Sequence, residues 1–219
     1  MKIGIVGAGF IGRAVARLAI ANGHEVMISN SRGPKSLMST MIALKCAVGT
    51  VADAVAFGDV VLLAVPFSSI EDLAPAPFAG KVVMDAGNYY PQRDGDIPAL
   101  DAHETTTSEM VAAQLPEARI VKAWNAILEK DIEVDTRPAG AVGRRALPIA
   151  GDDAEAKRIV AGLFDTLGYD VVDAGALAEG WRFERARPAY CVRFDVAGLN
   201  AALAEADAGA ALAEGSWRS

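Results

Sequence analysis

The feature that most constrains the fold is a glycine-rich turn between an apolar run and a segment of helical periodicity. The turn, residues 7–12, reads GAGFIG and matches the pattern GxGxxG. It follows the apolar run 2–6, which is typical of a strand buried on both faces, and precedes apolar residues at helical spacing. In this context Gly7 permits a tight turn, Gly9 lets the backbone approach a pyrophosphate, and Gly12 allows close packing of the helix on the strand. The sequence therefore predicts a dinucleotide site at the start of the helix, and the alternative is a glycine-rich turn without a ligand.

The rest of the chain continues to alternate between strand-like and helix-like segments. Strands are expected at 25–29, 45–48, 59–65, 81–85 and 119–123. Helices are expected at 34–43, 50–57, 108–115 (capped by Ser108) and 196–214. A long irregular loop is expected at 87–105, and a second strand–helix–strand run at 146–173. This alternation predicts an α/β fold, a doubly wound Rossmann fold with a mostly parallel sheet and a small C-terminal α/β lobe. We expect the dinucleotide-binding domain to span residues 1–143. The lobe, residues 144–219, is expected to pack on it and on a second subunit.

Composition narrows the class of protein. The chain has 219 residues, of which 52% are hydrophobic, enough for a sizeable core, and its formal net charge is −7. This charge disfavours nucleic acid as a partner, because phosphate backbones are bound by surplus Lys and Arg. Cys46 and Cys191 lack the spacing of a disulfide framework or a zinc site, so we expect buried thiols and no metal. No apolar stretch reaches the roughly 20 residues of a membrane helix, and arginines interrupt the N-terminal run too early for a signal peptide, so a soluble, cytoplasmic protein is expected.

The end of the second predicted strand indicates which dinucleotide is bound. NAD-binding proteins of this type carry an Asp or Glu there, which accepts hydrogen bonds from the ribose 2′-hydroxyl. Residues 29–35 read SNSRGPK and contain no carboxylate, while Ser31 and Arg32 offer a hydroxyl and a guanidinium to a 2′-phosphate. The segment favours NADP(H) over NAD(H), and the alternative is a polar turn without a role in binding.

Three further strand ends are expected to line the same crevice, because ligands of open α/β sheets bind beyond the carboxyl ends of the strands. Pro66 follows the strand 59–65 and is expected to turn the chain beneath the nicotinamide. Asn88 and Asn125 follow the next two strands and carry amides suited to a carboxamide or a ribose. For each of these residues, the alternative is a structural role at the end of its strand.

The sequence contains no evident proton-transfer machinery. His103, in the segment 87–105, is a weak candidate for a catalytic residue, with a solvated loop histidine as the alternative, and His24 is expected to be structural. No Ser-His-Asp or metal-ligand pattern occurs in the sequence. Such a site suits direct hydride transfer between NADP(H) and another redox cofactor, whose own ring carries the chemistry.

The segments that carry these features resemble a known family. MKIGIVGAGFIGRAVARLAIANGHEVMISNSRGP, VLLAVPFSSI, VVMDAGNYY, ARIVKAWN and LPIAGDDAEAKRIVAGLFDTLGYDVVDAG are similar, in order, to NADP oxidoreductases that use the deazaflavin coenzyme F420, and to the oxidoreductase domain of the STEAP metalloreductases. The resemblance implies that NADP(H) is held against a deazaflavin or flavin-type ring and that the subunits pair as a homodimer. Trp124 stands where phenylalanine is usual, which implies a narrower acceptor pocket.

The resemblance also implies roles for individual residues. It assigns the pyrophosphate to Gly7, Gly9, Phe10, Ile11 and Gly12, the 2′-phosphate to Asn30, Ser31, Arg32 and Lys35, the nicotinamide side to Val65, Pro66, Phe67 and Asn88, and the far wall to Ala123, Trp124 and Asn125.

The leading interpretation is an NADPH-dependent oxidoreductase that exchanges hydride with a deazaflavin (F420) or flavin-like acceptor. One alternative is reduction of a small carbonyl or imine, although the reductases with this first βαβ unit need a long helical second domain, for which the chain after residue 145 is too short. The other is a non-catalytic NADPH sensor or binding subunit. The acceptor site is expected to be a shallow crevice completed by the C-terminal tail or by a second subunit. Candidates to bind an anionic acceptor tail, with a solvated basic surface as the alternative, are Arg137, Arg144, Arg145, Arg182, Arg185 and Arg187.

Overall fold

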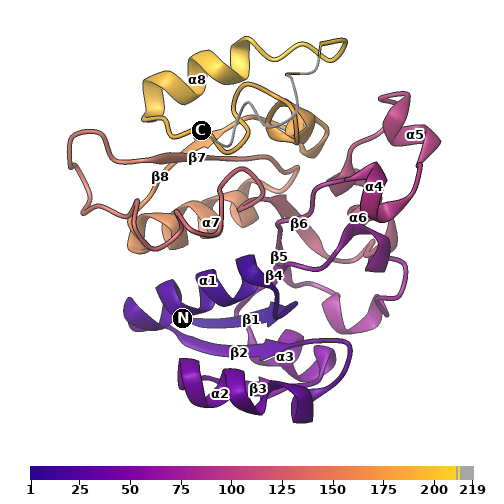
Figure 1. The fold of residues 1–219 in the computed structure, drawn as a ribbon, viewed down its shortest axis with the longest axis vertical. Coiled ribbons are helices and arrows are strands. Elements are labelled where there is room, and N and C mark those ends of the chain that lie inside the picture. Colours follow the sequence, from indigo (N-terminus) through magenta and orange to yellow (C-terminus); the bar gives the residue numbers. More distant parts are fainter. Residues whose placement is uncertain (211, 213–219) are drawn as a thin grey trace.

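Six parallel strands form the central sheet of the chain (Figure 1). The computed structural model describes residues 1–210 and 212 and places the strands in the order β3-β2-β1-β4-β5-β6. Each neighbouring pair is parallel. The order reverses between β1 and β4, the point at which open α/β sheets bind their ligands. The strands are β1 (Lys2–Val6), β2 (Glu25–Ser29), β3 (Ala47–Gly49), β4 (Val60–Leu63), β5 (Val82–Asp85) and β6 (Arg119–Lys122).

Helices cover both faces of this sheet. Successive strand residues point to opposite faces, so each buried strand has apolar side chains on both that must be covered. On β4, Val60 and Leu62 lie in the hydrophobic cluster that also contains residues of α1 and α7, whereas Val61 and Leu63 lie in the cluster with residues of α3 and α6. The helices that follow the strands are α1 (Phe10–Ala21), α2 (Met38–Leu44), α3 (Val51–Phe57) and α6 (Thr107–Gln114). The α/β fold with a doubly wound parallel Rossmann sheet is therefore confirmed.

A small C-terminal lobe adjoins the β6 edge of the sheet (Figure 1). Its two parallel strands, β7 (Ala146–Ile149) and β8 (Asp170–Asp173), are connected through α7 (Ala154–Thr166). Ala150, directly after β7, forms an antiparallel bridge with Lys122 at the end of β6. The hydrophobic cluster containing β1 and α1 continues into α7, and α8 (Val196–Ala204) packs on β7 and β8 through a separate cluster. The lobe thus shares a core with the large sheet. The boundary expected after residue 143 falls in the turn before β7.

The segment 87–105 is not the irregular loop that the sequence predicted. It contains two one-turn helices, α4 (Pro91–Asp94) and α5 (Pro98–Asp101), each beginning at a proline, whose fixed φ suits a first helical residue. The carboxylate of Asp94 accepts a hydrogen bond from the amide of Tyr90 (2.9 Å), and the hydroxyl of Tyr89 accepts one from the amide of Ile97 (2.9 Å). These bonds hold the segment in an ordered conformation, although its composition predicted an irregular loop.

Two other helix expectations need correction. The cap of α6 is Thr106, which forms a capping box with Glu109, while Ser108 is buried and donates to Asp85 (2.6 Å). The alanine-rich helix expected at 196–214 ends at Ala204, because the guanidinium of Arg187 binds the carbonyl oxygens of residues 207, 208 and 210 and holds the chain in a turn. Residues 211, 213 and 214 of that expected helix lie outside the described residues.

Smaller differences concern the elements around β3. The helix expected at 34–43 is a 3-10 turn, Pro34–Leu37, followed by α2, and the strand expected at 45–48 begins only at Ala47, because Lys45 adopts a left-handed conformation (φ 54°) that ends α2. In residues 1–210 and 212, no helix combines the length and the apolar character that crossing a membrane would need.

Candidate functional site

The glycine-rich turn lies at the carboxyl end of β1 and leads directly into α1. Gly7 has φ +114°, and a Cβ there would lie 2.2 Å from the carbonyl oxygen of Ala64, just after β4. A Cβ at Gly12 would lie 2.0 Å from the carbonyl oxygen of Gly7, whereas no atom lies within 4 Å of the Cβ position of Gly9. The turn is thus packed against the sheet on one side and open at Gly9, where a phosphate would approach.

The start of α1 is suited to an anion. The N-cap residue Gly9 provides no side-chain hydrogen bond, and the first turn of the helix contains no acidic residue. The first amides of the helix and the positive end of its dipole therefore have no competing carboxylate. A pyrophosphate fits this arrangement. Beside it, Phe10 is 81% exposed and offers an apolar surface to a bound ring or ribose.

The turn after β2 presents two exposed cations. Asn30 shapes this turn, because its side-chain oxygen accepts a hydrogen bond from the amide of Arg32 (3.0 Å) and its amide donates to Ser36 (2.9 Å). The side chains of Ser31, Arg32 and Lys35 are exposed, and in the described part of the chain neither cation forms an ion pair. The structure therefore gives Asn30 a role in the turn itself and leaves the hydroxyl and the two cations available to a 2′-phosphate.

A cleft of about 630 Å³ runs from the start of α1 across the carboxyl ends of β4, β5 and β6. Of the residues proposed from the sequence, those that line it are Gly9, Phe10, Ile11, Val65, Pro66, Asn88, Trp124 and Asn125. The lining residues that sequence reasoning did not assign to the site are Ala64, Ala86, Tyr90, Gln92, Arg93, Ile127, Leu128, Glu129, Tyr190 and Cys191. The last two come from the C-terminal lobe, so this lobe forms part of the wall.

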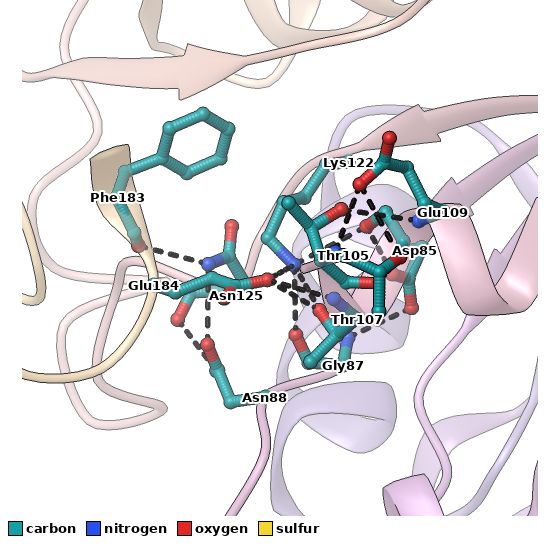
Figure 2. A network of polar contacts seen from close by, with 12 residues as sticks. Asp85, Gly87, Asn88, Thr105, Thr107, Glu109, Lys122, Asn125, Phe183 and Glu184 are labelled. Atoms are coloured by element: carbon teal, nitrogen blue, oxygen red, sulfur yellow. Dashed lines mark hydrogen bonds and ion pairs between the residues drawn. The ribbon is translucent and has the colours of Figure 1, made fainter. Parts of the chain in front are cut away.

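Asn88 and Asn125 both line the cleft, and their side chains lie next to each other (Figure 2). The amide of Asn88 donates to the main-chain oxygen of Asn125 (3.0 Å), and the amide of Asn125 donates to the main-chain oxygen of Phe183 (3.0 Å) and to the side-chain oxygen of Asn88 (3.2 Å). The side-chain oxygen of Asn125 is buried and has no hydrogen-bond partner among the described residues. A buried acceptor without a partner is costly, and a nicotinamide carboxamide has the N–H donors that would satisfy it.

A buried ionic network lies beside these asparagines and was not predicted from the sequence (Figure 2). The ammonium of Lys122, a fully buried side chain, contacts a carboxylate oxygen of Glu184 (3.0 Å) and donates to the hydroxyl of Thr107 (2.6 Å) and the main-chain oxygen of Gly87 (3.3 Å). Burial raises the pKa of Glu184, but the charge of Lys122 and the hydrogen bonds from Thr107 outweigh it and hold this pKa below its ordinary value. The network therefore fixes the main chain at Gly87, next to Asn88, and holds Glu184, which follows the Phe183 carbonyl that binds Asn125.

A pair of tyrosine hydroxyls forms another part of the cleft that the sequence did not reveal. The hydroxyl oxygens of Tyr90 and Tyr190 are 2.6 Å apart, and both residues line the cleft. Burial raises the pKa of Tyr190 far above its ordinary value, and the neighbouring Cys191 and Tyr90 raise it further. Burial likewise raises the pKa of the Cys191 thiol, to about 12. Both groups are therefore neutral hydrogen-bonding groups at physiological pH.

Several residues proposed from the sequence lie elsewhere. Phe67 is buried against Tyr89 on the other side of the sheet, and Ala123 is fully buried in the core. Trp124 reaches the cleft wall, but its ring is 1% exposed and stacks on Phe164 (4.3 Å between ring centres). The indole therefore lies mainly in the core.

His103 is also separate from the cleft. Its exposed side chain follows α5 and lines a different cavity, of about 340 Å³, together with Tyr89, Trp181 and Arg185. This placement contradicts a catalytic role for His103 in the cleft. His24 contacts the hydroxyl of Thr166 (3.3 Å), which agrees with its expected structural role. Among residues 1–210 and 212, no three His, Cys, Asp or Glu side chains are grouped so as to hold a metal ion.

The arginines proposed for an anionic acceptor tail are mostly committed to the protein itself. Arg144 is buried and pairs with Asp165 (2.7 Å) and Asp170 (2.8 Å), and Arg145, 1% exposed, pairs with Asp135 (2.5 Å). The buried Arg187 binds main-chain oxygens after α8, as described above, and Arg182 pairs with Glu179. Arg144, Arg145 and Arg187 are thus buried and bound to other parts of the chain, and they do not form a solvated basic surface. The sequence showed the clustered charges but not the carboxylates and carbonyl oxygens that fold against them.

The chain is similar to known proteins in both its sequence and its fold. The family described as NADP oxidoreductase, coenzyme F420-dependent, matches residues 2–89. The metalloreductase STEAP3 of Rattus norvegicus is 30% identical over 186 residues, 84% of this chain, and the chain spans 36% of that protein's length. The crystal structure of the hypothetical protein SMa0349 of Sinorhizobium meliloti has a TM-score of 0.74 and 33% identity, covering 89% of this chain and 94% of that one. A crystal structure from Arthrobacter sp. FB24, described as a proposed F420-dependent NADP reductase, has a TM-score of 0.67 and 30% identity, covering 80% of this chain and 85% of that one.

Proposed function

The chain belongs to the family of coenzyme F420-dependent NADP oxidoreductases, and we propose that it transfers a hydride between NADP(H) and a deazaflavin (F420) or another flavin-like acceptor. The observation that carries this proposal is one continuous cleft that joins the start of α1, which has no acidic residue in its first turn, to the side-chain oxygen of Asn125, which has no hydrogen-bond partner among the described residues. Its volume, about 630 Å³, lies within the range of sites for small organic ligands.

The residues of the first βαβ unit would hold the cofactor. The amides at the start of α1 would bind the pyrophosphate, and Ser31, Arg32 and Lys35 would bind the 2′-phosphate. Asn125 would accept a hydrogen bond from the carboxamide, with Asn88 holding it in place. When bound, NADPH supplies the hydride. The protein would position the nicotinamide against the acceptor and partly shield both from water.

Part of the cleft wall suits a flat, conjugated acceptor. It is formed by apolar side chains, Ile127 and Leu128, and by the hydroxyls of Tyr90 and Tyr190. No histidine lines the cleft among the described residues, and the carboxylate that does so, Glu129, is exposed. This wall offers little acid–base catalysis, which supports an acceptor whose own ring stabilises the transferred electrons over one that needs a strong proton donor.

Stopped-flow oxidation of NADPH by a panel of acceptors tests this function. We expect the enzyme to bind NADPH and to oxidise it rapidly with a 5-deazaflavin or FMN, and slowly or not at all with small ketones and imines. Faster turnover with a ketone or an imine would instead assign it to carbonyl or imine reduction. Tight NADPH binding without turnover on any acceptor would contradict the proposal and identify a sensor.

A further inference from the structure

The pair of tyrosines in the cleft has no role in binding NADP(H) as described above. Tyr90 precedes α4, and Tyr190 lies 100 residues later in the C-terminal lobe, yet their hydroxyl oxygens are 2.6 Å apart. Both residues line the cleft, together with Asn125 and the neighbouring Cys191. The fold therefore brings two polar groups from distant segments to one point on the wall where the acceptor would lie.

We propose that Tyr90 is a catalytic residue of the hydride step, whose hydroxyl donates a hydrogen bond to the acceptor atom that gains negative charge, and that Tyr190 is the positioning residue which orients this hydroxyl. This inference rests on the proposed function, since it assigns a part of the same cleft to the acceptor.

Counting hydroxyl hydrogens supports this direction of donation. Each tyrosine hydroxyl has one hydrogen, and one of the two is used in the bond between them. Tyr190 is 4% exposed, whereas Tyr90 is half-buried and so nearer to the open cleft. When the buried hydroxyl of Tyr190 donates, the hydrogen of Tyr90 remains for a ligand. The thiol of Cys191, which also lines the cleft, interacts with the hydroxyl of Tyr190 and has a hydrogen of its own to donate to it.

Two guanidinium groups contact the ring of Tyr90 and restrict its position, as a precise donor requires. The guanidinium of Arg93 lies 4.7 Å from its ring centre, and that of Arg185 lies 5.4 Å from it. Arg93 is itself fixed by Asp94 (2.8 Å) and by the main-chain oxygen of Asn88 (2.9 Å). The donor is therefore tied to the same segment that carries Asn88, and its position is set before the acceptor binds.

The chemistry of the step explains why a neutral donor suffices. A C–H bond of the nicotinamide breaks and its electron pair travels with the hydrogen to the acceptor, so that NADPH becomes NADP⁺ and the acceptor becomes an anion with one new bond to hydrogen. In a flavin-type ring, this negative charge spreads onto a ring nitrogen and a carbonyl oxygen. A hydrogen bond to one of these atoms strengthens as the charge develops, and such bonds accelerate reactions. The acceptor then takes a proton from solvent.

Single-turnover kinetics of three phenylalanine variants test the assignment. With saturating NADPH and FMN or a 5-deazaflavin, Tyr90→Phe is expected to lower the rate constant of hydride transfer by about 10²-fold, the usual effect of losing one such donor. Tyr190→Phe should lower it by a smaller factor, since the donor remains but is less well oriented. The Kd of NADPH, measured by fluorescence titration, should stay unchanged in both.

Tyr89→Phe is the matched control, because it removes the same atom from the adjacent residue. The hydroxyl of Tyr89 bonds to Asp101 (3.1 Å) and to the amide of Ile97 (2.9 Å), and Tyr89 does not line the cleft. This variant should keep the wild-type rate, and a loss equal to that of Tyr90→Phe would show that both act only on the structure of the segment.

The visible spectrum of a bound flavin distinguishes loss of the hydrogen bond from Tyr90 from a change in the packing of its ring. In the complex of oxidised FMN with NADP⁺, a hydrogen bond from Tyr90 should shift the visible absorption of the bound flavin, and Tyr90→Phe should remove this shift. A wild-type rate in Tyr90→Phe, while the wild-type enzyme reduces FMN, would overturn this inference alone. A wild-type protein that neither binds nor reduces any flavin-type acceptor would overturn the proposed function, and this inference with it.

Discussion

Arg32 is the residue expected to determine the preference for NADPH. Its guanidinium is exposed at the end of β2 beside Ser31, with no carboxylate between residues 29 and 35. Arg32→Ala should weaken NADPH binding by about 10-fold to 100-fold, the effect of losing one charged hydrogen bond, and leave NADH binding unchanged. Fluorescence titration with both nucleotides measures this difference.

Arg158→Ala provides the control, because Arg158 is exposed on α7 and pairs only locally with Glu155. It should leave both affinities unchanged. An equal loss of NADPH and NADH affinity in Arg32→Ala would contradict the assignment of this turn to the 2′-phosphate.

Glu184 is expected to be the residue whose loss most destabilises the network behind the cleft. Glu184→Gln leaves the buried ammonium of Lys122 without its counter-charge, so it should reduce the free energy of unfolding by about 3 kcal/mol. The lowered pKa of Glu184 also gives this contribution a pH dependence. It is complete above the ordinary carboxyl pKa of 4.5 and is lost as the pH falls below that value, because the unfolded chain takes up the proton first.

Chemical denaturation at several pH values tests both statements. The wild type should lose stability between about pH 5 and pH 3 more steeply than Glu184→Gln does. Glu117→Gln, at an exposed position before β6, is the control and should follow the wild type. If Glu184→Gln were as stable as the wild type at pH 7, the network would have no structural importance.

At this scale, the sequence revealed the residues whose role is local and missed those whose role depends on distant partners. The open position at Gly9 and the cations after β2 could be predicted, because a short pattern determines each of them. Lys122 lies 62 residues from Glu184 in the sequence, and nothing near either residue indicates the other. Arg145 was interpreted as part of a basic cluster for the same reason, since its buried pairing with Asp135 forms only in the folded chain.

At the scale of elements, the junction of β1 and α1 depends on the absence of a side chain at Gly12. Gly12→Ala would place a Cβ 2.0 Å from the carbonyl oxygen of Gly7, which forces the helix away from the strand. We expect a loss of about 1 to 3 kcal/mol in the free energy of unfolding, together with weaker NADPH binding.

Gly162→Ala is the matched control for this variant, because Gly162 lies within α7 and has no atom within 4 Å of its Cβ position. It should raise the stability by roughly 0.5 to 1 kcal/mol, since alanine is the better helix former. Thermal unfolding of the two variants measures both effects, and a stable Gly12→Ala with normal NADPH affinity would contradict the close approach of α1 to β1.

The order and type of the main elements could be predicted because their apolar patterns are local, whereas several helix ends could not. Thr50 caps α3 through a capping box with Asp53 three residues later, a local pattern that the sequence shows directly. The cap of α6 was assigned to Ser108 although it is Thr106, because three threonines and a serine stand in a row and only the folded chain shows which hydroxyl faces the helix and which faces Asp85. The one-turn helices α4 and α5 are too short to produce a periodic pattern.

At the scale of the whole molecule, the small C-terminal lobe completes the wall of the cleft. The sequence predicted that the tail or a second subunit would complete a shallow acceptor site. In the structure the chain itself supplies Tyr190 and Cys191 to the cleft wall, and the main-chain oxygen of Phe183 holds Asn125. A homodimer remains a prediction, for which light scattering of the purified protein is the appropriate measurement.

The central claim is that NADPH bound in this cleft gives its hydride directly to a flavin-type ring, and isotope transfer tests it most directly. NADPH deuterated at one face of the nicotinamide C4 position is mixed with a 5-deazaflavin in a single turnover, and the product is analysed by mass spectrometry. The account predicts that one of the two deuterated forms transfers its deuterium to the deazaflavin and reacts more slowly than unlabelled NADPH. Deuterium retained in the cofactor with both forms, alongside tight NADPH binding, would contradict it.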